Sequence, residues 1–128
     1  MSAPLLRVQN RTRGSLLGER VRRANRPWSR AIGLLGRRSL GPGEGLVLVP
    51  CTSIHMLFMR FPLDVLYVDR QDRVVKAVRN LKPFRFSGCL RGAHYTIELP
   101  VGTIDGSGTA VGDQLGLVEA DGKPAATS

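Results

Sequence analysis

The stretch Leu63-Asp-Val-Leu-Tyr-Val-Asp-Arg-Gln-Asp-Arg-Val-Val-Lys-Ala-Val78 decides the fold. It holds two runs rich in β-branched and aromatic residues, Leu63–Asp69 and Arg73–Val78, on either side of the polar tripeptide Arg70-Gln-Asp72. Such runs favour extended strands, and a short polar connection between them is typical of an antiparallel hairpin. The sequence therefore predicts a β-hairpin at its centre.

Asp64 breaks the apolar pattern of the first of these strands. In an extended chain it points the same way as Leu66 and Val68, while Val65 and Tyr67 point the other way. Because both faces are otherwise apolar, the strand is predicted to lie inside a sheet with Asp64 at least partly buried. A buried carboxylate needs a cation or several hydrogen-bond donors.

Two roles for Asp64 remain open at this point. It either forms a structural interaction at the mouth of the strand, or it binds a ligand or acts as an acid or base, since both situations bury a carboxylate. Arg60, just before the Phe61-Pro62 bend, is one possible partner of Asp64, and Arg37 is another.

Further short strands are expected on both sides of the central hairpin. Asn10–Gly14 has the composition of a turn between two of them, and Gly41–Gly45 has the composition of a turn before a third. The predicted strands are Leu5–Gln9, Leu16–Val21, Leu46–Val49, His55–Arg60, Tyr95–Leu99 and Asp113–Val118.

One helix is expected, at 27–35. Pro27 suits a first helical turn, Trp28, Ala31, Ile32 and Leu35 recur at helical spacing, and Gly36 offers a left-handed stop. The expected fold class is α+β and mostly β: a small curled sheet or partly open β-barrel of about six to eight short strands with one short helix packed on it. Residues 1–118 are expected to form this single domain, and 119–128 a disordered tail.

The composition is that of a folded domain, with 42% hydrophobic and 23% charged residues among 128. No apolar run approaches the roughly 20 residues of a membrane-spanning helix, and no signal-peptide pattern is visible at the start, so a cytoplasmic location is expected. Cys51 and Cys89 are expected to be two buried free thiols, with a disulfide between them as the alternative.

The net charge of +9 is concentrated near the N-terminus. Residues 1–38 contain ten arginines and one acidic residue, whereas residues 39–128 contain nine cations and nine acids. This segment could attract nucleic acid or another anionic surface, or it could be solvated surface charge. Trp28 is the only aromatic residue in it, and the helical stripe assigns that residue to the core.

No known catalytic pattern is visible. There is no nucleophile elbow, phosphate-binding loop or dinucleotide fingerprint. Cys51, His55, Cys89 and His94 lack the paired spacings of zinc sites, so no metal and no cofactor are expected. Glu98 lies on the face of its strand opposite Ile97: it is either an ordinary surface acid or, if the sheet curls, a neighbour of Asp64.

Several strings resemble one family in the expected order. They are Gly33-Leu-Leu-Gly-Arg37 with Leu40 and Gly43-Glu-Gly45, then Phe58-Met-Arg60 with Pro62-Leu-Asp64, and finally Tyr95-x-Ile-Glu-Leu-Pro-x-Gly102 with Gly112-Asp113. The ordered set resembles the domain of unknown function 192 family, an uncharacterised ancient conserved region. The resemblance implies a compact β-rich fold and supplies no activity.

The polar positions matched to that family are Arg37, Arg60, Asp64 and Glu98, and the resemblance raises the expectation that they converge in the fold. Two guanidinium groups and two carboxylates could then form a polar pocket for a small ligand, or an ion-pair network that fixes the helix to the sheet.

Three functions follow from these observations. The first is a non-enzymatic binding or accessory module that takes a small polar ligand or a partner protein. The second is an enzyme with Asp64 or Glu98 as acid or base. The third is binding of nucleic acid or an anionic surface through the N-terminal arginines.

Overall fold

A computed structural model describes residues 5–24, 39–49, 53–56, 59–89, 91–119 and 121–125. These residues form one seven-stranded sheet, a separate two-stranded sheet and one short helix. The elements are β1 (Leu6–Asn10), β2 (Ser15–Ala24), β3 (Glu44–Leu48), β4 (Ser53–His55), β5 (Leu63–Val68), β6 (Val74–Leu81), β7 (Phe86–Gly88), β8 (Tyr95–Leu99), α2 (Thr103–Ser107) and β9 (Leu115–Glu119).

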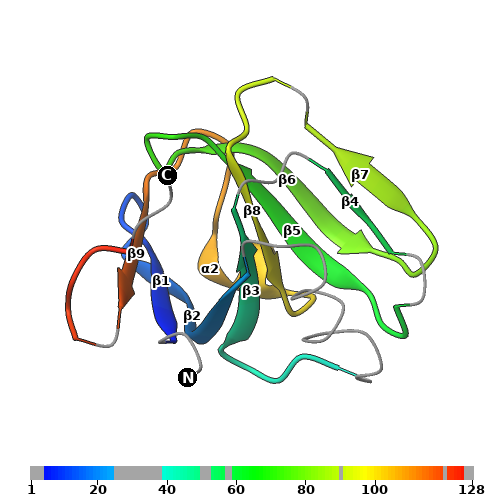
Figure 1. The fold of residues 1–128 in the computed structure, drawn as a ribbon, viewed down its shortest axis with the longest axis horizontal. Helices are drawn as coiled ribbons and strands as arrows, with labels where there is room; N and C mark the ends of the chain where they lie inside the picture. Colours follow the sequence, from blue (N-terminus) through cyan, green and yellow to red (C-terminus); the bar gives the residue numbers. More distant parts are fainter. Residues whose placement is uncertain are drawn as a thin grey trace.

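The large sheet has the strand order β6-β5-β8-β3-β2-β1-β9 and curls into a half-barrel (Figure 1). Neighbouring strands are antiparallel except β2 and β3, which run parallel. The curl brings the two edge strands together at one end. There the Val74 N–H donates to the Asp113 carbonyl at 3.0 Å, and the Gly112 N–H donates to the Val74 carbonyl at 2.7 Å.

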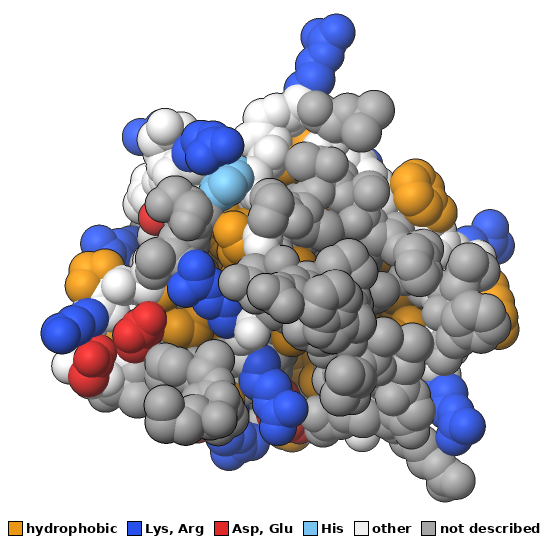
Figure 2. Space-filling view, in the orientation of Figure 1, with side chains coloured by type: hydrophobic (Ala, Val, Ile, Leu, Met, Phe, Trp, Pro, Cys, Tyr) orange, Lys and Arg blue, Asp and Glu red, His pale blue; other side chains and the backbone are white. Residues whose placement is uncertain are grey.

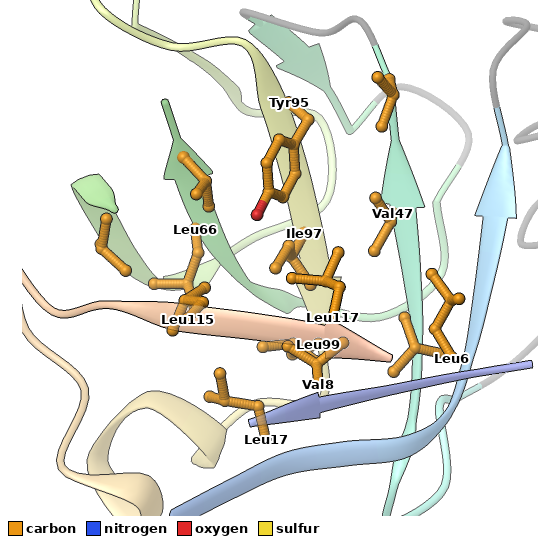
Figure 3. Packing of buried hydrophobic residues seen from close by; sticks show 14 of the residues in the cluster. Leu6, Val8, Leu17, Val47, Leu66, Tyr95, Ile97, Leu99, Leu115 and Leu117 are labelled. Carbon is orange, nitrogen blue, oxygen red and sulfur yellow. The ribbon is translucent and has the colours of Figure 1, made fainter. Parts of the chain in front are cut away.

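Each face of the sheet carries its own apolar core, because successive side chains of a strand point to opposite faces. The concave face gathers side chains from strands far apart in the sheet order, which point toward one another in Figure 3. They include Leu6, Val8, Leu17, Val47, Leu66, Tyr95, Ile97, Leu99, Leu115 and Leu117. The opposite face gathers Leu40, Leu46, Leu48, Met56, Met59, Phe61, Leu63, Val65, Tyr67 and Leu81.

The predicted fold class is confirmed by this mostly-β, curled architecture with a short helix. The predicted central hairpin forms, since β5 pairs with β6, and β1 pairs with β2 across the predicted turn at Asn10–Gly14. The helix expected at 27–35 lies outside the described residues. The helix in the described part of the chain is α2. With five residues, it is too short to cross a membrane.

The strand expected at His55–Arg60 is wrong in its extent. Strand β4 ends at His55. This residue pairs with Phe86, the first residue of the partner strand β7, so the two-stranded sheet goes no further. Arg60 instead lies in an exposed bend. Residues 121–125 turn back along β9, where the Ala125 N–H donates to the Leu117 carbonyl at 2.9 Å.

Gly45 allows β3 to approach β8 closely. A Cβ atom at this position would lie 2.9 Å from the Glu98 carbonyl oxygen and 3.0 Å from a Leu99 methyl group. Real side chains essentially never make contacts this short to a backbone atom, so one of the two strands would have to move. Gly106 in α2 is the opposite case, because a Cβ atom there would have nothing within 4 Å.

We expect Gly45→Ala to lower the free energy of unfolding by about 1 to 3 kcal/mol, because it overpacks a closed strand interface. Gly106→Ala is the matched control and should raise the free energy by about 0.5 to 1 kcal/mol, because alanine restricts the unfolded chain and suits a helix. Urea denaturation followed by circular dichroism measures both. Equal stability of the two variants would contradict the close approach.

Candidate functional site

Asp64 is buried, as the sequence predicts, with 1% of its surface exposed. Its carboxylate accepts three hydrogen bonds, all from backbone N–H groups. The Asn80 N–H donates to Oδ1 at 2.9 Å, and the Gly102 and Ile104 N–H groups donate to Oδ2 at 3.1 and 2.9 Å. No arginine in the described segments donates to it, so the predicted pairing with Arg60 is wrong, and Arg37 lies outside those segments.

These hydrogen bonds fix two irregular pieces of backbone. Asn80 adopts a left-handed φ of 54° at a bulge in β6, where two residues oppose Asp64 alone. Gly102 precedes α2 and has no side chain to cap the helix. Asp64 therefore supplies from β5 the acceptor that an N-cap residue normally supplies, and places a negative charge at the helix N-terminus.

Glu98 lies on the other face of the sheet. In the antiparallel register Asp64 pairs with Leu99, which belongs to the concave core, whereas Glu98 pairs with Val65, which belongs to the opposite core. Glu98 is fully buried at 0% exposure, so it is not a surface acid. The two carboxylates do not share a cavity, because the strand register places them on opposite faces of the sheet. The curl of the sheet does not bring these faces together.

A third buried carboxylate, Asp113, joins the β1–β2 turn to the start of β9. Its Oδ2 accepts hydrogen bonds from Asn10 Nδ2 at 2.9 Å, Arg13 Nε at 3.0 Å and the Ala110 N–H at 2.9 Å. Burial raises the pKa of a carboxyl, but these donors outweigh burial and hold the pKa of Asp113 below its usual value. Sequence reasoning missed this cluster because Asn10 and Asp113 are distant in the chain.

Tyr95 ties the central hairpin to β8. Its hydroxyl donates to Asp72 Oδ1 at 2.7 Å, in the turn between β5 and β6. Burial, together with the hydrogen bond to Asp72 and the charges of Asp72 and Asp69, raises the pKa of Tyr95. The phenol therefore stays protonated and serves as a donor.

A groove of about 440 Å³ lies beside α2, bounded by the first residues of β2, the turn before β3 and the segment that leads into the helix. We call it the α2 groove. A smaller hollow of about 240 Å³ continues it along β2 as far as Glu19. The α2 groove is lined by Leu16, Leu17, Leu40, Pro42, Gly43, Pro100, Val101, Gly102, Thr103, Gly106 and Ser107.

The side chains that line the α2 groove are mostly apolar, and none of them is ionisable. Leu16 and Val101 stand at its walls with 43% and 48% of their surfaces exposed. Thr103 and Ser107 supply the only side-chain hydroxyls of this lining, and both are occupied: Thr103 Oγ1 donates to the Pro100 carbonyl at 2.7 Å, and Ser107 Oγ lies 2.7 Å from Thr109 Oγ1. The groove therefore offers apolar contact rather than a charged or catalytic centre.

Four groove residues belong to strings singled out in the sequence: Leu40, Gly43, Pro100 and Gly102. The sequence offered no signal for Leu16 and Val101, since single exposed aliphatic residues are common on surfaces. Elsewhere in the described ranges, no three His, Cys, Asp or Glu side chains lie close enough to hold a metal ion.

The half-barrel and its α2 groove define a small β-rich domain without a recognisable catalytic centre among the described residues. The model of DUF192, an uncharacterised ACR, matches residues 8–117, and the chain belongs to this family.

Two archaeal sequences and two bacterial structures are similar. A UPF0127 protein of Thermococcus sibiricus is 34% identical over 110 residues, covering 83% of this chain and 71% of the relative. A UPF0127 protein of Pyrococcus furiosus is 36% identical over 112 residues, covering 83% and 93%. A Novosphingobium aromaticivorans protein of unknown function has a TM-score of 0.71 at 22% identity, covering 86% of this chain and 81% of that one.

The second structure, from Sinorhizobium meliloti and described as a "putative transcription regulator", has a TM-score of 0.73 at 25% identity, with 86% and 89% coverage. These two structures share the fold of this chain. The family itself has no established function.

We expect Asp64→Asn to lower the free energy of unfolding by about 2 to 4 kcal/mol, because its NH2 group would replace one carboxylate oxygen and face a backbone N–H that loses its acceptor, while the negative charge is lost. Asp105→Asn is the control: its side chain is 72% exposed and pairs with an exposed Arg79, so the change should be small, within about 0.5 kcal/mol. Chemical denaturation measures both. An Asp64→Asn protein as stable as the control would show that the three hydrogen bonds contribute little.

The lowered pKa of Asp113 predicts a pH-dependent contribution to stability. A carboxylate with a depressed folded-state pKa stabilises the fold above its unfolded pKa, and this contribution is lost as pH falls through the folded pKa. Asp113→Asn should therefore cost about 1 to 3 kcal/mol at pH 7. The difference from wild type should shrink below the ordinary value of 3.8. Denaturation curves from pH 7 to pH 3 test this, and a constant difference would contradict it.

Proposed function

We propose that this protein is a non-enzymatic binding module that takes an apolar segment of a partner protein into the α2 groove. The observation that carries the proposal is the pair of exposed aliphatic side chains, Leu16 and Val101, at the walls of a groove with no ionisable lining. Exposed apolar surface arranged in a concavity is typical of protein-binding sites.

The chemistry of the lining favours an apolar segment over the small polar ligand suggested by the sequence. A polar ligand is oriented by a few convergent charged or amide groups. The two hydroxyls in the α2 groove are already hydrogen-bonded within the protein, and its remaining lining is aliphatic, proline or glycine. Binding would therefore come from apolar contact and shape.

The burial and hydrogen bonds of Asp64 favour a structural role for this carboxylate over a role as an acid or base. A general acid or base must reach its substrate. Asp64 is 1% exposed and its oxygens are held by three backbone donors. A cytoplasmic location remains a prediction, and the free thiol of half-buried Cys89 is compatible with it.

Peptides of twelve residues selected from a phage-displayed random library against the full chain test the proposal. We expect apolar peptides to emerge and to bind Leu16→Asp and Val101→Asp proteins at least about tenfold more weakly, because a charge would enter the groove. Fluorescence anisotropy of labelled peptides measures the affinities. Val111→Asp is the matched control, since Val111 is 63% exposed and does not line the α2 groove.

Two results would reject the proposed function. One is a set of selected peptides whose affinity is unchanged by Leu16→Asp and Val101→Asp. The other is an equal loss of affinity in Val111→Asp, which would indicate a nonspecific effect of added negative charge.

A further inference from the structure

Two phenylalanines protrude from the connection between β6 and β7. Phe84 and Phe86 have 70% and 71% of their surfaces exposed, the largest exposed fractions among the large hydrophobic side chains that the structure describes. Lys82 and Arg85 on the same segment are also exposed. We call Lys82–Phe86 the aromatic–basic loop. It shares no residue with the α2 groove.

The backbone holds Phe84 in an unfavourable conformation. Its φ is 65°, in the left-handed region that glycine and asparagine enter easily and bulky residues rarely do. Such strain persists only where the surroundings enforce it, and it is commonly found at functional positions. A glycine would relieve the strain, so the fold does not account for an exposed aromatic ring here.

Hydrogen bonds to Met56 hold the loop in place. The Phe84 N–H donates to the Met56 carbonyl at 2.8 Å, and the Met56 N–H donates to the Arg85 carbonyl at 2.8 Å. Met56 itself is fully buried in the apolar core on the face of the sheet opposite the concave one. The two rings are therefore presented from an anchored turn.

The charged residues that flank the loop in the sequence are all basic, and of these Arg79 pairs with Asp105 of α2. No acidic residue occurs from Arg73 to Ile97, a span that contains six arginines and lysines. Figure 2 shows hydrophobic and basic side chains next to one another along the right-hand edge, where Figure 1 draws the start of β7. A partner for this surface must therefore be anionic and offer flat apolar groups.

We propose that the aromatic–basic loop binds single-stranded nucleic acid. Phe84 and Phe86 stack on unpaired bases, and Lys82 and Arg85 contact the phosphates beside them. Base–aromatic stacking and phosphate neutralisation together are the common means of binding single strands without sequence preference. This site differs from the N-terminal arginines that the sequence suggested, since it supplies two exposed aromatic rings, whereas the single aromatic residue of that segment, Trp28, is expected in the core.

The order of residues along the loop favours a nucleic acid over a membrane surface. Arg85 lies between the two phenylalanines, so inserting both rings among acyl chains would carry its charge toward the apolar layer. Alternating rings and cations match alternating bases and phosphates instead.

Fluorescence anisotropy of the full chain with fluorescein-labelled dT20 and rU20 tests the proposal. Phe84→Gly should weaken binding about five- to a hundredfold, as expected for the loss of one stacked base. The same change should leave stability unchanged or raise it, because glycine accepts the left-handed φ. Lys82→Ala with Arg85→Ala should flatten the dependence of log affinity on log salt by about 0.7 per cation removed.

Val111→Ser serves as the control, because it removes an exposed aliphatic side chain from another surface and should not change the affinity. The proposal is rejected if wild type binds neither oligonucleotide, or if Phe84→Gly binds as tightly as wild type. It is also rejected if polyglutamate competes as well as the oligonucleotides, which would indicate charge alone. Loss of binding to phosphatidylserine vesicles, but not to oligonucleotides, in Phe84→Gly would identify a membrane surface instead.

Discussion

The buried carboxylate of Asp64 is the interaction on which the rest of the structure depends. It places a negative charge inside an apolar sheet, where the desolvation cost is offset only by well-aligned donors. Its three donors come from two separate segments, the β6 bulge and the N-terminus of α2. The position of α2, and with it one wall of the α2 groove, is thereby coupled to the central hairpin.

The strings that indicate the family divide into two groups in the structure. Asp64, Asp113, Gly45 and Tyr95 hold distant segments together through hydrogen bonds or close packing. Leu40, Gly43, Pro100 and Gly102 line the α2 groove, and Gly102 also donates to Asp64. The same short segments thus build the sheet and shape the surface beside it, so a family signature need not mark a catalytic centre.

The sequence predicted those features that depend on local periodicity. A run of β-branched and aromatic residues identified β5, alternation identified β8, and the apolar surroundings of Asp64 predicted its burial. It did not predict the partners of Asp64, because backbone N–H groups are present at nearly every residue and leave no pattern. Strand β7 and helix α2 are three and five residues long, too short for any period to be visible. The face occupied by Glu98 depends on strand pairing, which one sequence does not reveal.

The position of β1 between β2 and β9 has a consequence for the order of assembly. Leu6 pairs with Val21 on one side and with Glu119 on the other, so the sheet joins segments from both ends of the described chain. Contacts this distant in sequence slow folding, and during synthesis the sheet cannot close until β9 has left the ribosome. Until then one edge of β1 is open to strands of other chains, which makes exchange of β9 between neighbouring copies the natural route of misassembly.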